Sequence, residues 1–356
     1  MTATASLFDD SLQLLKQLIA TPSFSREEEA TAALLFTFLQ EKGYAPQRQG
    51  NNVWLRSADW RDERPTLLLN SHHDTVKPAQ GWTLDPFSPT EQEDRLHGLG
   101  SNDAGGPLVA LLAAFRHLET QTDRPYNLIW AATAEEEISG KNGIESLLPT
   151  LGPIALGIVG EPTQMQMAIA EKGLMVLDGT AYGQAGHAAR DEGDNAIYHA
   201  LRDVEWFRTF EFPDVSPHLG KVKMSVTQIE AGSQHNVVPD RCRFVVDVRT
   251  TECYSNLETL EIIRRHVRSD IQPRSTRLNP SGLPLDHPVV QRGLSLGLSH
   301  YGSPTLSDQA LMPFPTLKIG PGDSARSHTA DEFIRPSELQ EGIDLYIRLL
   351  EGLAIH

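Results

Sequence analysis

The chain has 356 residues, of which 39% are hydrophobic and 22% charged, as is ordinary for a soluble globular protein with a substantial core. Its length exceeds the roughly 250–300 residues at which a single core usually stops growing, so we expect two domains. The formal net charge of −16 argues against nucleic acid or an anionic membrane surface as a partner, because both require clustered positive charge.

The sequence contains no recognisable export or membrane signal. The stretch MTATASLFDDSLQLLKQLIA has early acids and no basic start, unlike a secretory signal, and no apolar run approaches the ~18–20 residues that span a bilayer. Cys242 and Cys253 are the only cysteines, too few for a disulfide framework. We therefore expect a cytoplasmic protein with two inert thiols.

The first half of the chain predicts alternating helices and buried strands. A helix is expected over 7–19, and a second after Ser25, where Ser-Arg-Glu-Glu fits a capping box, ending at Gly43. Short apolar runs that predict buried strands occupy 66–69, 127–132 and 154–159, and 107–118 has a helical pattern. This alternation predicts an α/β fold with a mostly parallel sheet flanked by helices.

The pattern changes near residue 174. Val222, Met224 and Val226 alternate with polar residues, as do apolar residues over 242–248, which is typical of antiparallel strands with one wet face. Helical stretches at 195–210 and 257–270 fall between these strands. We expect an inserted α+β, ferredoxin-like βαββαβ domain at 174–274.

After the insert, the chain is expected to return to the first domain, which would comprise 1–173 and 275–356. The run 313–319 predicts another buried strand. Ser337-Glu-Leu-Gln resembles a capping box that begins the last helix.

Polar side chains gather where the predicted strands end. The first strand leads into His72 and Asp74, the second into Glu135–Glu137, and the third into Glu161. Ligands of open α/β sheets bind beyond the carboxyl ends of the strands, so we expect one polar cluster there. Asp103, on a glycine-rich loop before a helix, is a further candidate member.

Crowded carboxylates must take up protons unless a cation neutralises them. Histidine with Asp and Glu suits zinc, with cobalt or manganese as alternatives, and five candidate ligands with one able to bridge indicate two metals. An extended chain places neighbouring side chains on opposite faces, so His72 and Asp74 share a face and His73 points away, toward hydrogen-bonding partners elsewhere.

Five sequence blocks resemble the metal-site blocks of the M20 family of dinuclear zinc peptidases and deacylases. They occur in family order, which makes the signal strong although each block alone is weak. The blocks are His72-x-Asp74, Gly100-Ser-Asn-Asp103, Ala134-Glu-Glu136-Glu137, Gly160-Glu161-Pro-Thr and Ser327-His328-Thr. The resemblance implies a zinc-exopeptidase-like catalytic domain and an insert that serves as a dimerisation domain and lid.

The resemblance also implies a role for each matched residue. Asp103 would bridge two divalent metals, zinc or alternatively cobalt. His72 and Glu161 would complete one metal site. Glu137 and His328 would complete the other. The remaining two matches are Asp74, which would orient the first histidine, and Glu136, which would be the general base.

In the insert, Gly183-Gln-Ala-Gly-His187 resembles the motif whose histidine reaches the partner subunit's site and helps to hold an oxyanion. Asn236 and Arg249 match positions that bind the substrate in relatives. Two of these residues also have a plain structural alternative: His187 could be a structural histidine, and Arg249 could simply pair with Asp247 or a cross-strand acid.

The chain departs from the family in the loop before Asp103. The family commonly has Gly-Arg-Gly-Ser-x-Asp-Met-Lys-Gly there, and this chain has Gly-Leu-Gly-Ser-Asn-Asp-Ala-Gly-Gly. The ligand position is intact, but the missing Arg and Lys leave the assignment to a subfamily open.

The resemblance implies a homodimeric metalloenzyme that hydrolyses the amide bond of a small N-acyl amino acid. Within the family, length and loop sequence favour the branch that deacylates N-acetylornithine or N-acetylcitrulline, with acetyl or succinyl groups, in arginine biosynthesis. The alternatives are a succinyl-diaminopimelate desuccinylase, a dipeptidase or carboxypeptidase, and a metal-binding relative without catalysis. The presence of Glu136 argues against the last, because binding alone needs no base.

Overall fold

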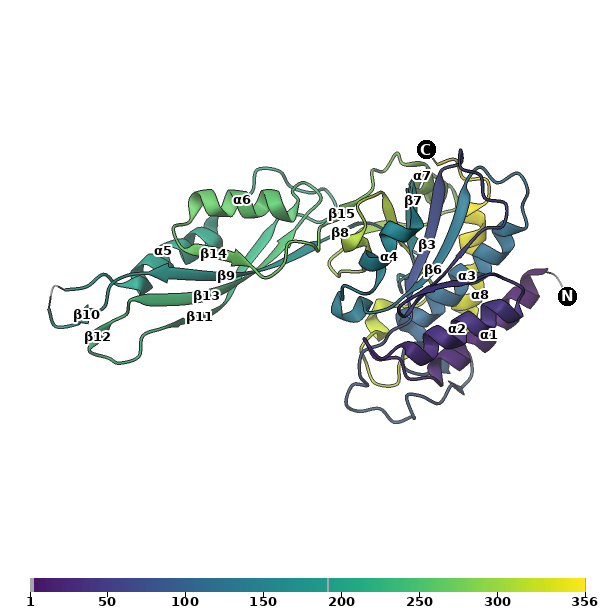
Figure 1. Cartoon of the computed structure of the whole chain (residues 1–356), viewed down its shortest axis with the longest axis horizontal. Helices are drawn as coiled ribbons and strands as arrows, with labels where there is room; N and C mark the ends of the chain where they lie inside the picture. The colour runs from purple at the N-terminus through teal and green to yellow at the C-terminus, as the bar shows by residue number, and fades with distance from the viewer. Residues whose placement is uncertain (1–2, 191, 356) are drawn as a thin grey trace. The chain divides into compact units, whose positions relative to one another are not determined.

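The computed structural model describes residues 3–190 and 192–355, and the chain divides into two compact units (Figure 1). Unit 1 comprises Met1–Ile169, Leu283–Tyr301 and Ser307–His356, and unit 2 comprises Ala170–Gly282 and Gly302–Leu306. Unit 2 thus contains the residues 174–274 expected to form the insert, together with short flanking segments.

The mixed sheet of unit 1 has the order β1-β2-β6-β3-β7-β17-β8, and β8 also pairs with the short strands β15 and β16. Strand β15 and the last residues of β8 and β16 fall within the bounds of unit 2. Its four central strands, β6, β3, β7 and β17, are parallel, and antiparallel strands occupy its edges. The strands are β1 (Gln47–Gln49), β2 (Asn52–Arg56), β3 (Thr66–His72), β6 (Asn127–Thr133), β7 (Leu156–Val159), β8 (Met167–Glu171), β15 (Ser281–Gly282), β16 (His300–Ser303) and β17 (Thr316–Lys318).

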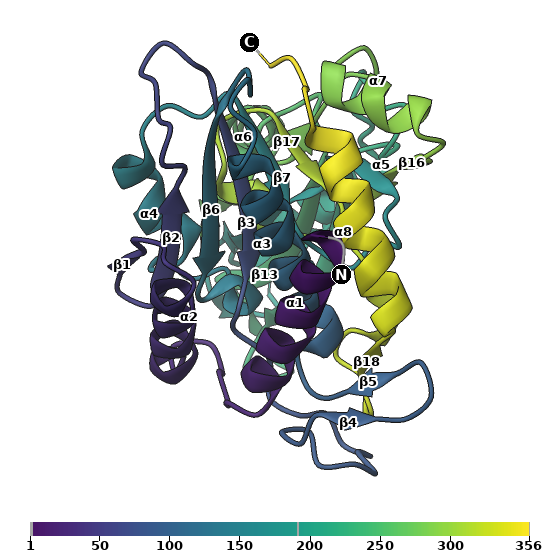
Figure 2. The same cartoon turned by 90° about the vertical axis from the view of Figure 1, so that its right-hand side faces the viewer.

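Helices cover both faces of this sheet. Figure 2 shows α1, α3 and α8 together on one face, and their buried residues share a core with the residues of α2. A smaller core beneath α4 covers the other face. The helices of unit 1 are α1 (Ala3–Ile19), α2 (Glu29–Glu41), α3 (Gly106–Glu119), α4 (Ile144–Leu151), α7 (Pro288–Ser295) and α8 (Pro336–Leu350).

Strand β3 shows how the sequence selects the two faces. All seven of its residues are buried. Leu67 and Leu69 belong to the core with α1, α3 and α8, whereas Leu68 belongs to the core with α4. Side chains alternate along a strand, so His72 is delivered on the same face as Leu68. Burying each leucine contributes about 1.5–3 kcal/mol, which fixes this register firmly.

Unit 2 has the predicted βαββαβ element order. Its four-stranded antiparallel sheet runs β11-β13-β9-β14, and the apolar side chains of its inner face pack with residues of both helices. Its elements are β9 (Gly173–Tyr182), α5 (Ala196–Thr209), β11 (Lys223–Ala231), β13 (Arg241–Thr250), α6 (Asn256–His266) and β14 (Asp270–Pro273), with a ribbon of β10 (Gly186–His187) and β12 (Val237–Val238). The predicted fold class, a mostly parallel α/β sheet with a ferredoxin-like α+β part, is confirmed.

Two predicted capping boxes are wrong. Helix α2 begins at Glu29 rather than directly after Ser25, its N-cap is Glu28, and the Ser25 hydroxyl donates to Asp74 at 2.7 Å. Helix α8 begins at Pro336, and the residue that pairs with Glu338 in its capping box is Arg335. Ser337 lies inside the first turn and binds Asp94 instead.

A small sheet in the order β18-β5-β4 joins distant parts of unit 1, where β4 is Thr90–Glu91, β5 is Leu96–His97 and β18 is Phe333–Ile334.

Both cysteines are free. None of the helices in the described part of the chain is long and apolar enough to cross a membrane.

Candidate metal and active site

The candidate site lies at the carboxyl ends of the central strands. His72 is the last residue of β3, Glu135–Glu137 follow β6 after Ala134, and Glu161 follows β7 after Gly160. Asp103 lies on the loop that enters α3, where Gly100 has φ +74° and approaches Thr75 too closely to carry a side chain. The strand ends therefore converge as the alternating pattern predicted.

Asp103 lies between two histidines. Its Oδ1 is 3.3 Å from His72 Nε2, and its Oδ2 is 3.7 Å from His328 Nε2. The same His328 nitrogen is 2.9 Å from Glu137 Oε2, and His72 Nε2 is 3.7 Å from Glu161 Oε1. The five predicted ligands thus meet around one carboxylate, each of whose oxygens faces a different imidazole.

Glu136 belongs to the same cluster, with Oε2 at 3.8 Å from His72 Nε2. Two groups of three side chains have ligand atoms all within 4.8 Å of one another: His72, Asp103 and Glu137, and His72, Glu136 and Glu161. The second group includes the predicted base, so the Glu136 carboxylate lies close to the predicted metal ligands His72 and Glu161.

The charges of this cluster are poorly balanced by the protein alone. Burial raises the pKa of Glu136 well above its usual range and that of Glu161 to about 8, and it also raises the pKa of Glu137. The hydrogen bond to Glu137 raises the pKa of His328 to about 9. Burial lowers the pKa of His72, but the surrounding carboxylates outweigh it and raise the pKa overall.

This donor set fits divalent cations. Two imidazoles and several carboxylates, without a thiolate, suit zinc and related metals, and the cations would replace the protons that crowded carboxylates otherwise hold. The geometry of Asp103 is compatible with a bridging ligand, because its two oxygens face separate histidines.

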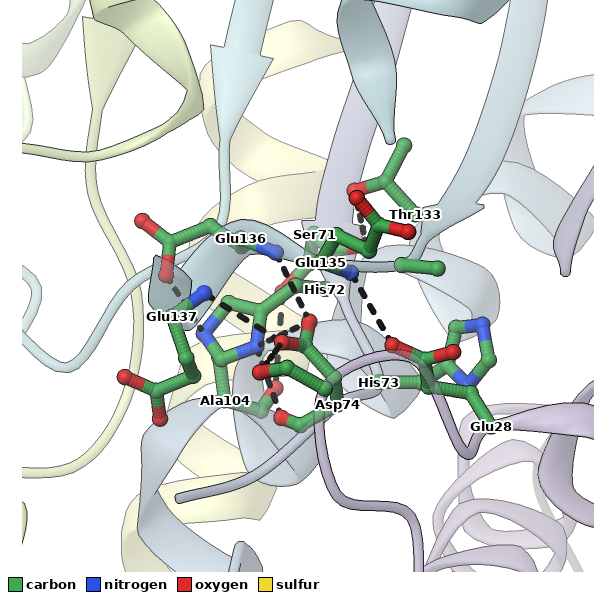
Figure 3. Close-up of polar contacts among 12 residues, drawn as sticks. Glu28, Ser71, His72, His73, Asp74, Ala104, Thr133, Glu135, Glu136 and Glu137 are labelled. Carbon is green, nitrogen blue, oxygen red and sulfur yellow. Dashed lines mark hydrogen bonds and ion pairs between the residues drawn. The ribbon is translucent and has the colours of Figure 1, made fainter. Parts of the chain in front are cut away.

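Asp74 is fully buried next to the candidate ligands and contacts several of them. Its Oδ1 lies 3.5 Å from His72 Nδ1, and its two oxygens accept the backbone N–H groups of Glu136 at 3.0 Å and Glu137 at 3.2 Å (Figure 3). The hydroxyl of Ser25 completes its partners. His72 Nδ1 also lies 3.0 Å from the backbone carbonyl of Asp74. Asp74 therefore holds the first histidine through its carbonyl and carboxylate together, and its carboxylate holds the turn that carries the two glutamates.

His73 points away from the cluster (Figure 3). Its Nε2 lies 2.9 Å from the Asn51 carbonyl and its Nδ1 lies 2.9 Å from the Thr31 hydroxyl. A carbonyl only accepts, so Nε2 carries the hydrogen of the neutral ring. Nδ1 faces the Thr31 hydroxyl, which also lies 3.0 Å from the Glu28 carbonyl. Burial lowers the pKa of His73 to about 4, which keeps it neutral. The prediction that His73 faces other partners is confirmed.

Two buried acids near the site had no signal in the sequence. Asp308 accepts hydrogen bonds from Asn70 at 2.8 Å and Thr133 at 2.7 Å, joining the ends of β3 and β6. Glu332 accepts from backbone N–H groups of the Asp103 loop. Their partners are more than 170 residues away along the chain, so only the folded structure brings them together.

The candidate residues of unit 2 have plain surroundings. His187 is exposed at the end of the β10–β12 ribbon, and its Nδ1 accepts from the N–H of Ala189. Asn236 is exposed, and its carbonyl accepts from Ala188. Arg249 forms a two-pronged ion pair with Asp247, at 2.9 and 3.2 Å, as the structural alternative for this residue anticipated.

Comparison with known proteins identifies the family. The model of Peptidase family M20/M25/M40 matches residues 68–352, which include all the candidate residues of the cluster. The chain belongs to this family. It is thus a member of a family of metallo-peptidases and amidohydrolases, and its general reaction is metal-dependent hydrolysis.

Individual relatives resemble the chain over almost its full length. The acetylornithine deacetylase of Proteus mirabilis is 29% identical over 384 residues, covering 97% of each chain. The crystal structure of aminopeptidase PepT from Bacillus cereus has a TM-score of 0.74 at 16% identity, covering 97% of this chain and 98% of that one.

A third similar structure is the YxeP protein of Bacillus subtilis, described as a dinuclear metal binding peptidase of the M20 family. Its TM-score is 0.69 at 14% identity, with 98% of this chain and 100% of that chain covered. At these identities, the two solved structures show that the fold is shared.

Proposed function

We propose that the protein hydrolyses the amide bond of an N-acyl amino acid, with N-acetylornithine or N-acetylcitrulline as the substrate. The observation that carries the proposal is the arrangement of Asp103 between His72 and His328, with Glu136 alongside. The similarity to an acetylornithine deacetylase over nearly the whole chain supports the choice of substrate.

Two divalent cations would be held by the residues around Asp103, as zinc or alternatively cobalt. His72 and Glu161 would complete one site, and Glu137 and His328 the other, with Asp103 shared. When bound, such cations lower the pKa of water toward ~7 and polarise a carbonyl oxygen. The partition follows the contacts of Asp103, whose Oδ1 faces His72 and whose Oδ2 faces His328.

Glu136 would carry the proton. A water oxygen forms a bond to the acyl carbon, Glu136 takes up the proton that the water loses, and then delivers it to the nitrogen as the C–N bond breaks. A carboxylate whose burial raises its pKa is suited to hold a proton between these steps. Asp74 would keep Glu136 in place by accepting a hydrogen bond from the backbone N–H of Glu136.

Unit 2 would supply substrate recognition and the dimer contact. The side chain of His187 is exposed. In a homodimer it would reach the site of the partner subunit and help to hold the oxyanion. Asn236, which is exposed, would contact the substrate's polar groups. Arg249 is the weaker candidate for the substrate carboxylate, because Asp247 already occupies its guanidinium fork.

The proposed setting is the cytoplasm, where removal of the acyl group would serve arginine biosynthesis. The test is a panel of N-acetyl and N-succinyl ornithine, citrulline and diaminopimelate, with dipeptides, incubated with metal-loaded protein and assayed for free amine. N-acetylornithine or N-acetylcitrulline should give the largest kcat/KM.

Faster release from N-succinyl-diaminopimelate or a dipeptide would replace the proposed substrate by that alternative. If the metal-loaded protein releases no amine from any member of the panel, the proposal that it is an enzyme is contradicted and a non-catalytic relative is favoured. Metal-free protein is the matched control, because amine release that survives removal of the metals does not come from this site.

A further inference from the structure

Glu332 is a buried carboxylate directly behind the candidate metal site. It lies between His328 and strand β18, and only 2% of its surface is exposed. Its Oε1 accepts the backbone N–H groups of Asn102 and Asp103, both at 2.9 Å, and its Oε2 accepts that of Gly100 at 3.0 Å. Three backbone hydrogen bonds thus tie one side chain to the loop that carries Asp103.

The backbone around Glu332 joins the same loop. The N–H of Gly98 donates to the carbonyl of Glu332 at 3.0 Å, and Phe333 pairs with His97 in the β18–β5 ladder. Asp103 follows one of these two paired segments, and His328 precedes the other. The pairing therefore links the loop of the shared carboxylate to the loop of the second histidine.

All three partners of the Glu332 side chain are N–H donors, which favour its carboxylate form. Burial raises the pKa of Glu332 to about 8, and these three hydrogen bonds oppose that rise. Both oxygens must accept, so an amide cannot replace the carboxylate in either orientation. One orientation places its NH₂ group against Gly100, and the other places it against Asn102 and Asp103.

We propose that Glu332 is a positioning residue for metal binding: it fixes the backbone of Asp103 so that the two carboxylate oxygens face His72 and His328. This inference rests on the proposed function, since it assumes that these side chains bind metal. Partners behind metal ligands typically change metal affinity about 10–100-fold when they are removed.

The experiment compares Glu332→Gln with a matched control, Asp331→Asn. The neighbouring Asp331 also accepts three hydrogen bonds, from the N–H and hydroxyl of Thr83 and the N–H of Leu84, but these tie down a different loop. Metal-free proteins are titrated with Zn²⁺ against a competing chelator, and the visible spectra of the Co²⁺-loaded proteins are recorded. Urea unfolding of each metal-free protein establishes that it is folded.

Glu332→Gln should weaken binding of at least one Zn²⁺ by about 10–100-fold and change the Co²⁺ spectrum, whereas Asp331→Asn should keep both close to wild type. If Glu332→Gln does not fold, Glu332→Asp takes its place, because it keeps the charge but is too short to reach both sides of the loop. Its expected effect has the same direction and a smaller size.

Wild-type Zn²⁺ affinity and an unchanged Co²⁺ spectrum in a folded Glu332 variant would overturn the inference. An equal loss of affinity in Asp331→Asn would also overturn it, because the effect would then be general loosening. Failure of the proposed function gives a different result: the wild-type protein itself would bind no Zn²⁺ in the titration or release no amine when loaded.

Discussion

Replacing His73 by glutamine should flatten the acid dependence of stability. Burial lowers the pKa of folded His73 to about 4, against about 6.5 for an unperturbed histidine. Between pH 6.5 and pH 4, His73 is therefore protonated in the unfolded chain but remains neutral in the folded protein. The stability that neutral His73 contributes is present above pH 6.5 and is lost as the pH falls toward 4.

The size follows from the width of that window. One pKa unit corresponds to about 1.4 kcal/mol, so lowering the pH from 7 to 5 should cost the wild-type protein about 2 kcal/mol through this residue. In His73→Gln, the side-chain NH₂ can still donate to the Asn51 carbonyl, and no titrating ring remains. The other titrating groups are common to both proteins and cancel in the comparison.

The assay is urea unfolding of metal-free wild type and His73→Gln at pH 7 and pH 5, followed by circular dichroism. The loss of unfolding free energy between the two pH values should be about 2 kcal/mol smaller in the variant. Equal losses in the two proteins would contradict a lowered pKa of His73, since they would show that this ring takes up its proton equally well in the folded and unfolded protein.

Three further substitutions test the site. Asp74→Asn turns an amide NH₂ toward a backbone N–H, such as that of Glu137, and should lower the unfolding free energy of the metal-free protein by about 1–3 kcal/mol in urea; no change would contradict its supporting role. Glu136→Gln should keep both metals by elemental analysis while kcat falls at least about 100-fold, and full hydrolysis would exclude it as the base. His72→Asn should lose metal whereas His73→Asn retains it, and equal metal content in the two variants would contradict their opposite roles.

The strands and their faces could be predicted because the signal is local. Leu67–Leu69 are apolar, and the alternation of β3 then determines where His72 and His73 point. The strand itself extends to His72, beyond the end of its apolar run, because its parallel pairing with β6 continues to Thr133.

The capping boxes failed for a reason that the sequence does not contain. A Ser followed three residues later by Glu or Gln can form a capping box, but the Ser side chain also bonds to whatever partner the fold brings near. For Ser25 that acceptor is Asp74, and for Ser337 it is Asp94, both far away along the chain. Tertiary hydrogen bonds overrode the local pattern in both cases.

The candidate site divides in the same way. The residues that meet around Asp103 could be predicted because each follows a strand or lies in a recognisable block. Asp308 and Glu332 could not, since each is a single acid whose partners come from distant loops and strands. The pairing of Arg249 with Asp247 was one of two predictions for that residue, and periodicity alone could not choose between them.

If metals held around Asp103 enable amide hydrolysis, adding metal to the metal-free protein must restore it. Metal-free protein is titrated with Zn²⁺ while free amine released from N-acetylornithine is measured. We expect no release without metal and a rate that stops rising at about two equivalents per chain, as a two-metal site requires. Full release by the metal-free protein, or none at two bound equivalents with any N-acyl amino acid, would contradict it.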